Sequence, residues 1–179
     1  MEKSPILFHG VPTVISVGSN NFLMEISENV SIPILRKDFT IDEYMIYEAK
    51  LLGASAVLLI VSILDDAQLK KYLNLAHELG LSAIVEPHDA NEIKTALDAG
   101  AEIIGVNNRN LADFTVDIEN SIRLRSLVGD DVVFISESVI KTKEDVTRLK
   151  ENNVDAVLIG ETLMRSEDKK SMIFELKNG

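Results

Sequence analysis

The segment "SAIVEPHDANEIKTALDAGAEIIGVNN", residues 82–108, holds two apolar runs with a helix-like stretch between them. The runs "SAIVE" and "EIIGVNN" are largely hydrophobic at successive positions, which is typical of strands buried on both faces in a parallel sheet. The stretch "ANEIKTALDAG" has apolar residues at a spacing of about 3.6 and ends in glycine, a common residue just after a helix. The segment therefore predicts a strand–helix–strand unit.

The same unit recurs along the chain, with further apolar runs in "TVISV", "IPIL", "AVLLIV", "VVFISES" and "DAVLIGE". Such alternation gives either an open doubly wound sheet or a (β/α)8 barrel. No G-x-G-x-x-G follows the first strand, and polar residues follow nearly every strand, which favours the barrel. Before "TVISV" only "HGVP" follows "ILF", too short for a parallel crossover of about a dozen residues. We therefore predict an α/β fold, a TIM (β/α)8-type barrel that is incomplete, with its first βα unit missing or reduced.

Composition points to one soluble globular domain over residues 1–179, with 46% hydrophobic and 26% charged residues. The formal charge of −11 argues against a nucleic-acid or anionic-membrane partner, although a local site can still hold a small anion. Cysteine is absent, no apolar run approaches the roughly 20 residues of a membrane span, and no secretory signal is visible. A cytoplasmic location is the default expectation.

Polar side chains at the predicted strand ends are the first candidates for chemistry. Lys37 follows "IPIL" and can serve as a general acid or Schiff base, although a surface lysine is an equal alternative. Glu86 ends "SAIVE", and a carboxylate at that depth needs a cationic partner such as Lys37. The alternative for Glu86 is a solvated strand end.

Asn107 and Arg109 stand two positions apart in "VNNRN", so both point to one side of the strand while Asn108 points to the other. Ser138 has no histidine at a nucleophile spacing, which argues against a serine hydrolase. The three histidines form no ligand spacing, so no metal site is expected.

The turns after the last two strands are candidates for holding a phosphate, because barrels often bind anions there. "SVIKTKED" offers Thr142 as a helix N-cap with Asp145 three residues later, and "IGETLMR" offers Gly160 and the N–H groups after it. The alternative for each turn is an ordinary connection between a strand and a helix that binds no ligand.

Taken together, the strand ends resemble the indole-3-glycerol-phosphate synthase family of (β/α)8 lyases. The motifs that carry the resemblance are "LRKDF", "GVNNRNL" and "SES", within matching segments from about residue 29 to 170. The resemblance implies ring closure of 1-(2-carboxyphenylamino)-1-deoxyribulose 5-phosphate, with loss of carbon dioxide and water, in tryptophan biosynthesis. It implies no cofactor and no metal.

Roles follow from the resemblance position by position. Lys37 would be the general acid and Glu86 would assist a later proton transfer, with Asn107 and Ser138 completing the catalytic set. Further substrate contacts would come from Phe39, Arg109, Glu137 and Phe22, and phosphate contacts from Val139, Ile159, Gly160 and Glu161.

The sequence also departs from the family pattern. A Glu-x-Lys pair expected on the first strand has no clear counterpart, since Glu2 and Lys3 do not fit its register. The loop "GSNNFLME" is short and keeps Phe22 as an aromatic, and Val139 stands where the family has glycine. A catalytically impaired member that binds a phosphate ligand or a partner subunit is therefore an alternative, as is another phosphosugar reaction. We further expect either a homodimer across the incomplete barrel or coverage of the gap by the N-terminal segment.

Overall fold

The computed structural model describes residues 8–9, 20–109 and 115–178, and the chain divides into two compact units. We call residues 13–104 the amino-terminal unit, and residues 105–179 together with residues 1–12 the carboxy-terminal unit. The division falls inside strand β5 (Ile103–Asn107).

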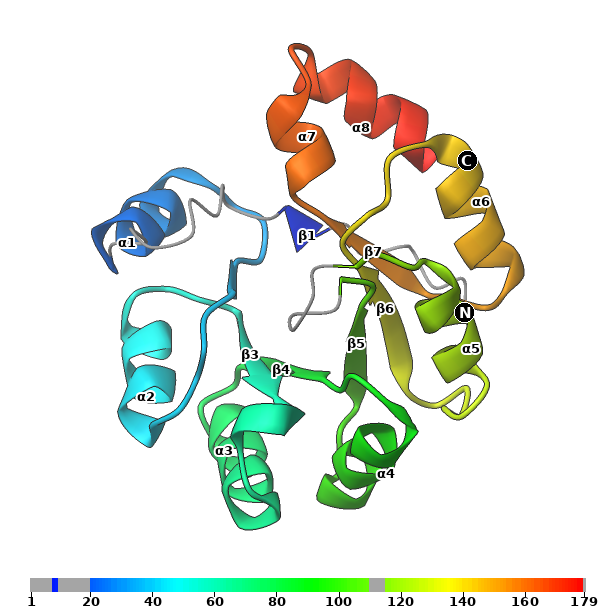
Figure 1. Cartoon of the computed structure of the whole chain (residues 1–179). Coiled ribbons are helices and arrows are strands. Elements are labelled where there is room, and N and C mark those ends of the chain that lie inside the picture. Colours follow the sequence, from blue (N-terminus) through cyan, green and yellow to red (C-terminus); the bar gives the residue numbers. More distant parts are fainter. Residues whose placement is uncertain (1–7, 10–19, 110–114, 179) are drawn as a thin grey trace. The chain divides into compact units, whose positions relative to one another are not determined.

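The amino-terminal unit alternates short helices with parallel strands (Figure 1). Its elements are α1 (Asn20–Asn29), β2 (Leu35–Arg36), α2 (Glu43–Leu51), β3 (Ala56–Ile60), the 3-10 helix η1 (Val61–Ile63), α3 (Asp66–Glu78), β4 (Ser82–Glu86), α4 (Ala90–Ala99) and the start of β5. Strand β3 pairs with β2 on one side and β4 on the other, and β4 pairs with β5, all in parallel. Helix α3 packs against β3 and β4.

The sequence explains these elements locally. All five residues of β3 are buried, as expected for a strand covered on both faces. The Asp65 side chain accepts a hydrogen bond from the Gln68 N–H, and Gln68 returns one to the Asp65 N–H, so that α3 starts with a complete capping box. Helix α4 is capped by Asp89 and ends at Gly100, which adopts a left-handed conformation.

Residues 20–25, predicted as part of a loop, instead begin helix α1, so that prediction was wrong. The helical signal was present: Leu23, Ile26 and Ser27 have the spacing of one helix face and are half-buried. Strand β2 is shorter than the predicted "IPIL", because Pro33 has no N–H to donate to a neighbouring strand. The predicted strand "TVISV" lies outside the described residues, as do Glu2 and Lys3.

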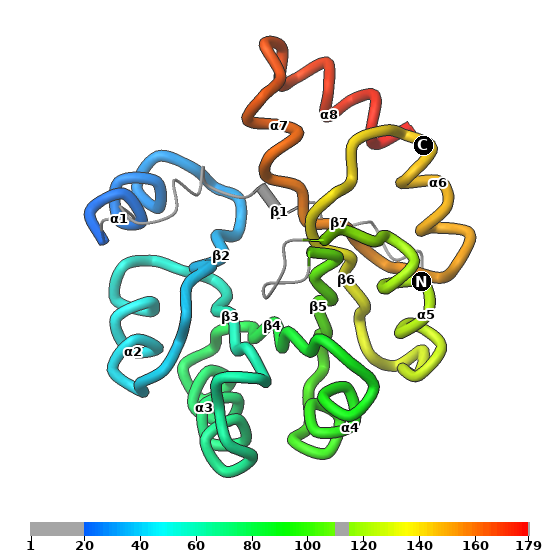
Figure 2. Tube along the Cα trace, viewed as in Figure 1, coloured from blue at the N-terminus to red at the C-terminus, as the bar shows by residue number. Residues whose placement is uncertain are grey.

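The carboxy-terminal unit continues the same alternation (Figure 2). Its elements are β1 (Phe8–His9), the end of β5, α5 (Glu119–Arg125), β6 (Val133–Glu137), α6 (Lys143–Glu151), β7 (Ala156–Ile159), α7 (Glu161–Arg165) and α8 (Lys169–Lys177). Strand β7 pairs in parallel with β6 and with β1, and α8 packs against α6 and α7. The parallel strands alternating with helices confirm the predicted α/β class and its incomplete barrel topology.

Candidate active site

Lys37 and Glu86 form an ion pair in the amino-terminal unit, as the sequence predicted. Lys37 directly follows β2 and Glu86 is the last residue of β4, so both stand at the carboxyl ends of their strands. Lys37 Nζ lies 3.1 Å from Glu86 Oε2, and the Glu86 side chain is only 2% exposed against 31% for Lys37. Because an isolated buried carboxylate is costly, the lysine offsets part of that cost while staying accessible to solvent.

Arg36 fixes the strand end from which Lys37 projects. Its guanidinium contacts Glu48 at 2.8 Å and donates to the Met45 carbonyl at 3.1 Å, which ties β2 to α2. Because side chains alternate along a strand, Arg36 on the helix side leaves Lys37 to point the other way, toward Glu86. Two residues further on, Phe39 presents an aromatic ring that is 59% exposed.

His88 is a neighbour of Glu86 that the sequence reasoning did not identify as part of the site. Its Nε2 lies 3.7 Å from Glu86 Oε1, and its Nδ1 lies 3.0 Å from Glu92 Oε2. The signal that could have found it is local: the histidine comes two residues after a buried strand-end glutamate and four before a glutamate in the next helix. His77, predicted to lie on the surface, is exposed on α3.

In the carboxy-terminal unit, Asn107 is the last residue of β5, and Arg109 comes two positions later. The Asn107 side chain accepts a hydrogen bond from the Arg109 N–H at 3.0 Å. The Arg109 guanidinium donates to Glu161 Oε2 at 2.8 Å, and Arg165 Nε donates to the other Glu161 oxygen at 3.0 Å. The hydrogen bond from Arg109, with the charge of Arg165, lowers the pKa of Glu161 below its ordinary value. The ion pair between Arg109 and Glu161 joins the segments that follow β5 and β7.

Asn108 points away from Asn107 and Arg109, as strand alternation predicts, and is buried. Its Nδ2 donates to Ser136 Oγ at 2.8 Å, while its Oδ1 accepts from Ser121 Oγ at 2.7 Å. Sequence reasoning did not identify this network, because its members lie in three separate segments. The network holds the end of β5 against β6 and α5, which fixes the direction of the Asn107 and Arg109 side chains.

Strand β6 ends at the fully buried Glu137, and the turn after it begins with two residues of positive φ. Ser138 and Val139 both have φ of 67°, and the Ser138 N–H donates to the Leu158 carbonyl at 3.1 Å. Helix α6 then starts with the capping box predicted at Thr142 and Asp145. The Val139 position thus needs the backbone conformation that glycine adopts most readily.

The turn after β7 lies next to that of β6. Ile159 is buried at the strand end, Gly160 precedes α7, and Glu161 is the first residue of the helix. A Cβ atom placed on Gly160 would meet no atom within 4 Å, so the space beside this residue is open. Thr162 Oγ1 donates to the Ile140 carbonyl at 2.6 Å, which links the two turns.

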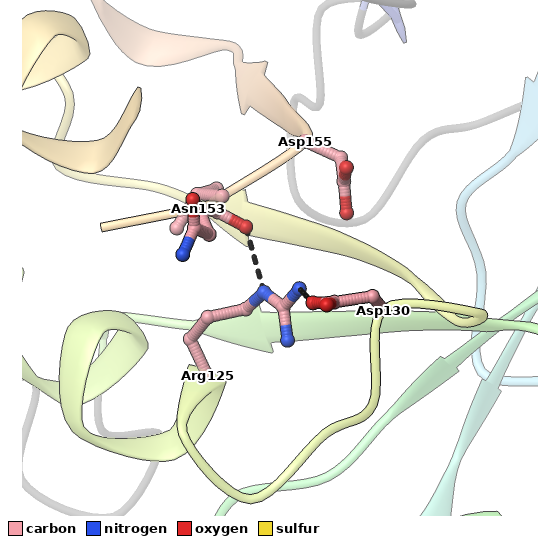
Figure 3. A pocket seen from close by; sticks show the side chains of 5 residues that line it. Arg125, Asp130, Asn153 and Asp155 are labelled. Atoms are coloured by element: carbon pink, nitrogen blue, oxygen red, sulfur yellow. Dashed lines mark hydrogen bonds and ion pairs between the residues drawn. The ribbon is translucent and has the colours of Figure 1, made fainter. Parts of the chain in front are cut away.

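A surface pocket of the carboxy-terminal unit lies at the other end of its strands (Figure 3). It is lined by Arg125, Asp130, Asn153, Val154 and Asp155, which precede β6 and β7. Arg125 is buried and donates to the Asn153 carbonyl and to Asp130. Barrel enzymes place their catalytic residues at the carboxyl ends of the strands. We therefore assign this pocket a structural role and do not take it as the candidate active site.

Two further observations concern metal binding and membrane insertion. Within residues 8–9, 20–109 and 115–178, no three His, Cys, Asp or Glu side chains are grouped so that they could hold a metal ion. No helix in the same part of the chain is long and apolar enough to cross a membrane.

The sequence model of the indole-3-glycerol phosphate synthase family matches residues 13–176. Indole-3-glycerol phosphate synthase of Ruminiclostridium cellulolyticum is 55% identical over 161 residues, covering 90% of this chain and 62% of the relative. The enzyme of the same name from Lachnoclostridium phytofermentans is 56% identical over 162 residues, covering 90% of this chain and 60% of the relative. The chain therefore spans about three fifths of the length of these curated relatives.

Solved structures with low sequence identity share the fold. The 3-hexulose-6-phosphate synthase of Salmonella typhimurium gives a TM-score of 0.75 at 17% identity, covering 89% of this chain and 78% of that one. Thiamine phosphate pyrophosphorylase of Pyrococcus furiosus gives a TM-score of 0.69 at 16% identity, covering 92% and 78%. At such identities the likeness concerns the fold alone.

Proposed function

Because the chain belongs to the indole-3-glycerol phosphate synthase family, we propose that it is a carboxy-lyase of tryptophan biosynthesis. The reaction closes the ring of 1-(2-carboxyphenylamino)-1-deoxyribulose 5-phosphate and releases carbon dioxide and water. The observation that carries the proposal is the Lys37–Glu86 ion pair, in which a buried carboxylate and a partly exposed ammonium group meet at strand ends. Ring closure and dehydration both need such a donor and acceptor.

In this proposal Lys37 is the general acid. Its ammonium group donates a proton to the substrate carbonyl oxygen as the aromatic ring carbon attacks, so that the oxygen leaves later as water. Decarboxylation restores the aromatic ring, and Glu86 assists the proton transfer that accompanies loss of water. The 3.1 Å contact between Lys37 and Glu86 keeps the two groups within reach of one another.

The substrate's polar groups are assigned to the end of β5 and the turn after β6. Asn107 and Ser138 complete the catalytic set, and Arg109 and Glu137 bind the substrate. Arg109 has the planar donor geometry that suits the substrate carboxylate. Phe39 and Phe22, both more than half exposed, supply aromatic surface for its ring.

The phosphate is assigned to the turns after β6 and β7, through the backbone of Val139, Ile159, Gly160 and Glu161. The open space beside Gly160 supports this assignment, since a phosphate oxygen needs close approach to backbone N–H groups. Val139 weakens the site, because its branched side chain occupies a position where glycine leaves the turn uncovered.

We further propose a homodimer and a cytoplasmic location. Tyr44, Tyr47 and Leu51 are exposed and stand at i, i+3 and i+7 of α2, so they form one apolar face that a second copy of the chain would cover. The net charge of −11 supports the absence of nucleic-acid and anionic-membrane partners.

The test is a steady-state assay of the whole chain with the carboxyphenylamino-deoxyribulose phosphate. Lys37→Ala is compared with Lys70→Ala, a substitution of an exposed lysine on α3. We expect indole-3-glycerol phosphate to form with the intact chain and with Lys70→Ala, and turnover to fall by roughly 10²-fold or more in Lys37→Ala. Binding of the substrate phosphate without turnover by the intact chain would instead support the alternative of a catalytically impaired family member.

A further inference from the structure

Glu161 is a carboxylate held between two arginines of the carboxy-terminal unit. Its Oε2 accepts a hydrogen bond from Arg109 Nη2 at 2.8 Å, and its Oε1 accepts one from Arg165 Nε at 3.0 Å. Arg109 comes two positions after β5, whereas Glu161 and Arg165 are the first and last residues of α7. The Glu161 carboxylate is therefore bonded to a guanidinium that projects from a different strand end.

That guanidinium is the group to which the proposed function assigns the carboxylate on the aromatic ring of the substrate. A guanidinium pairs well with any carboxylate, because its planar N–H donors match the two carboxylate oxygens. Glu161 is charged at neutral pH, since the hydrogen bond from Arg109, with the charge of Arg165, lowers its pKa below the ordinary value. The Glu161 side chain and the substrate carboxylate thus match the same cation in charge and in chemistry.

The contact between Arg109 and Glu161 is one that a ligand can displace. The Arg109 side chain is 36% exposed and the Glu161 side chain is 54% exposed, and exposed ion pairs contribute little to stability. Glu161 contacts the guanidinium through one nitrogen, Nη2. A ligand carboxylate that meets two nitrogens makes the stronger, bidentate pair, so it can replace Glu161.

Arg165 provides a partner for the Glu161 carboxylate after such a displacement. It lies four residues after Glu161 on the same helix, a spacing at which side chains are neighbours, and it bonds the other carboxylate oxygen. The Arg165 side chain is 79% exposed, so it can follow a movement of Glu161 without disturbing the core. The charge of Glu161 therefore stays paired when Arg109 turns to a ligand.

We propose that Glu161 is an internal competitor that occupies Arg109 until the carboxylate of the aromatic substrate displaces it, an inference that rests on the proposed function. In this role Glu161 determines specificity. A ligand gains the contact with Arg109 only if it brings a carboxylate, and a ligand without one leaves the pair of Arg109 with Glu161 intact.

The test measures, by calorimetry, the affinity for two ligands that cannot react because the ketone is reduced to an alcohol. One is 1-(2-carboxyphenylamino)-1-deoxyribitol 5-phosphate, and the other is 1-phenylamino-1-deoxyribitol 5-phosphate, which lacks the carboxylate. Kd of the second divided by Kd of the first gives the carboxylate preference, since both ligands carry the same phosphate. We expect Glu161→Gln to raise this preference about threefold, the size expected for one exposed ion pair.

Two controls show whether the effect passes through Arg109. Glu119→Gln removes the carboxylate of another exposed ion pair of the same unit, that of Glu119 with Arg148, and should leave the preference unchanged. In an Arg109→Ala background, Glu161→Gln should also have no effect, because no guanidinium is released.

The outcomes separate this inference from the proposed function. A preference that is unchanged or lower in Glu161→Gln, or that rises equally in the Arg109→Ala background, would overturn the competition while binding of both ligands still supports the proposed function. If the intact chain binds neither ligand, the proposed function fails and the competition fails with it.

Discussion

Val139 has a φ of 67°, a conformation that costs a non-glycine residue roughly 1–2 kcal/mol. Its β-branched side chain adds to the difficulty, since it restricts the rotamers further. The neighbouring contacts maintain the turn: the Ser138 N–H is bonded to Leu158, and Ile140 is buried. From the sequence, Val139 was expected to disfavour such a turn, and the structure adds that the turn keeps this backbone despite the valine.

We predict that Val139→Gly stabilises the fold slightly and tightens phosphate binding. Glycine removes the backbone cost but adds about 0.5–1 kcal/mol of unfolded-state entropy, so the net gain stays within about 1 kcal/mol. Inorganic phosphate titrated by calorimetry measures affinity, and urea unfolding measures stability. Val139→Ala is the matched control, because it removes the branch but keeps most of the backbone cost. Unchanged or weaker phosphate binding by Val139→Gly would contradict the crowding argument.

A second prediction concerns the Arg109–Glu161–Arg165 cluster. The cluster lowers the pKa of Glu161 below its ordinary value of 4.5, so it stabilises the folded chain above that pH. The contribution is lost as the pH falls through the lowered folded-state pKa. Glu161→Gln should therefore reduce the melting temperature at pH 7, and the difference from wild type should vanish at strongly acidic pH. Glu167→Gln, which alters an exposed glutamate with no ion pair to a described residue, should show no such pH-dependent difference.

At the scale of elements, hydrophobic runs and caps predicted the strands and most helices. Strands β3 and β4 and the capping boxes of α3 and α6 depend on neighbours within a few residues, so the sequence displays them directly. Helix α1 was not foreseen, because only one side of it is half-buried and its apolar spacing covers a short segment. Local sequence patterns therefore predict buried helices and strands well, and they predict surface helices poorly.

The contact between α1 and the end of α2 gives a prediction at this scale. A Cβ on Gly53 would lie 2.6 Å from Ser27 Cβ, and Gly53 also has φ of 85°. Gly53→Ala should therefore cost more than the roughly 1–2 kcal/mol of the left-handed backbone alone. Gly100→Ala is the control, since its φ is 95° but no atom lies within 4 Å of the added Cβ. Equal losses in urea unfolding would show that α1 does not pack here.

Site residues could be predicted from the sequence where their own position in the chain indicated a role. They could not be predicted where the role depends on contacts between segments far apart in the sequence. Lys37, Glu86 and Arg109 were identified from their places at strand ends, and the Lys37–Glu86 contact was inferred because a buried carboxylate needs a cation. The buried network around Asn108 joins three segments, so no local pattern revealed it. His88 was set aside because histidines were considered only as metal ligands or nucleophile partners.

At the scale of the whole molecule, the single domain over residues 1–179 stays a prediction, and the chain divides into two compact units. The association state offers a direct test. We predict that the chain is a dimer by sedimentation equilibrium and that Leu51→Glu, at a residue 86% exposed on α2, shifts it to monomer. Phe174→Glu, which alters an exposed residue on α8, should leave the dimer intact. A wild-type monomer at micromolar concentration would contradict the proposed interface.

The most direct test of the proposed lyase is product formation by the intact chain, together with Lys37→Ala, Glu86→Gln and the double variant. If the ion pair acts as one unit, each single substitution removes most of the turnover and the double variant loses little more, because groups that act together are not additive. That pattern, with measurable turnover in the intact chain, is the predicted result. No turnover in the intact chain, or turnover that survives Lys37→Ala, would contradict it.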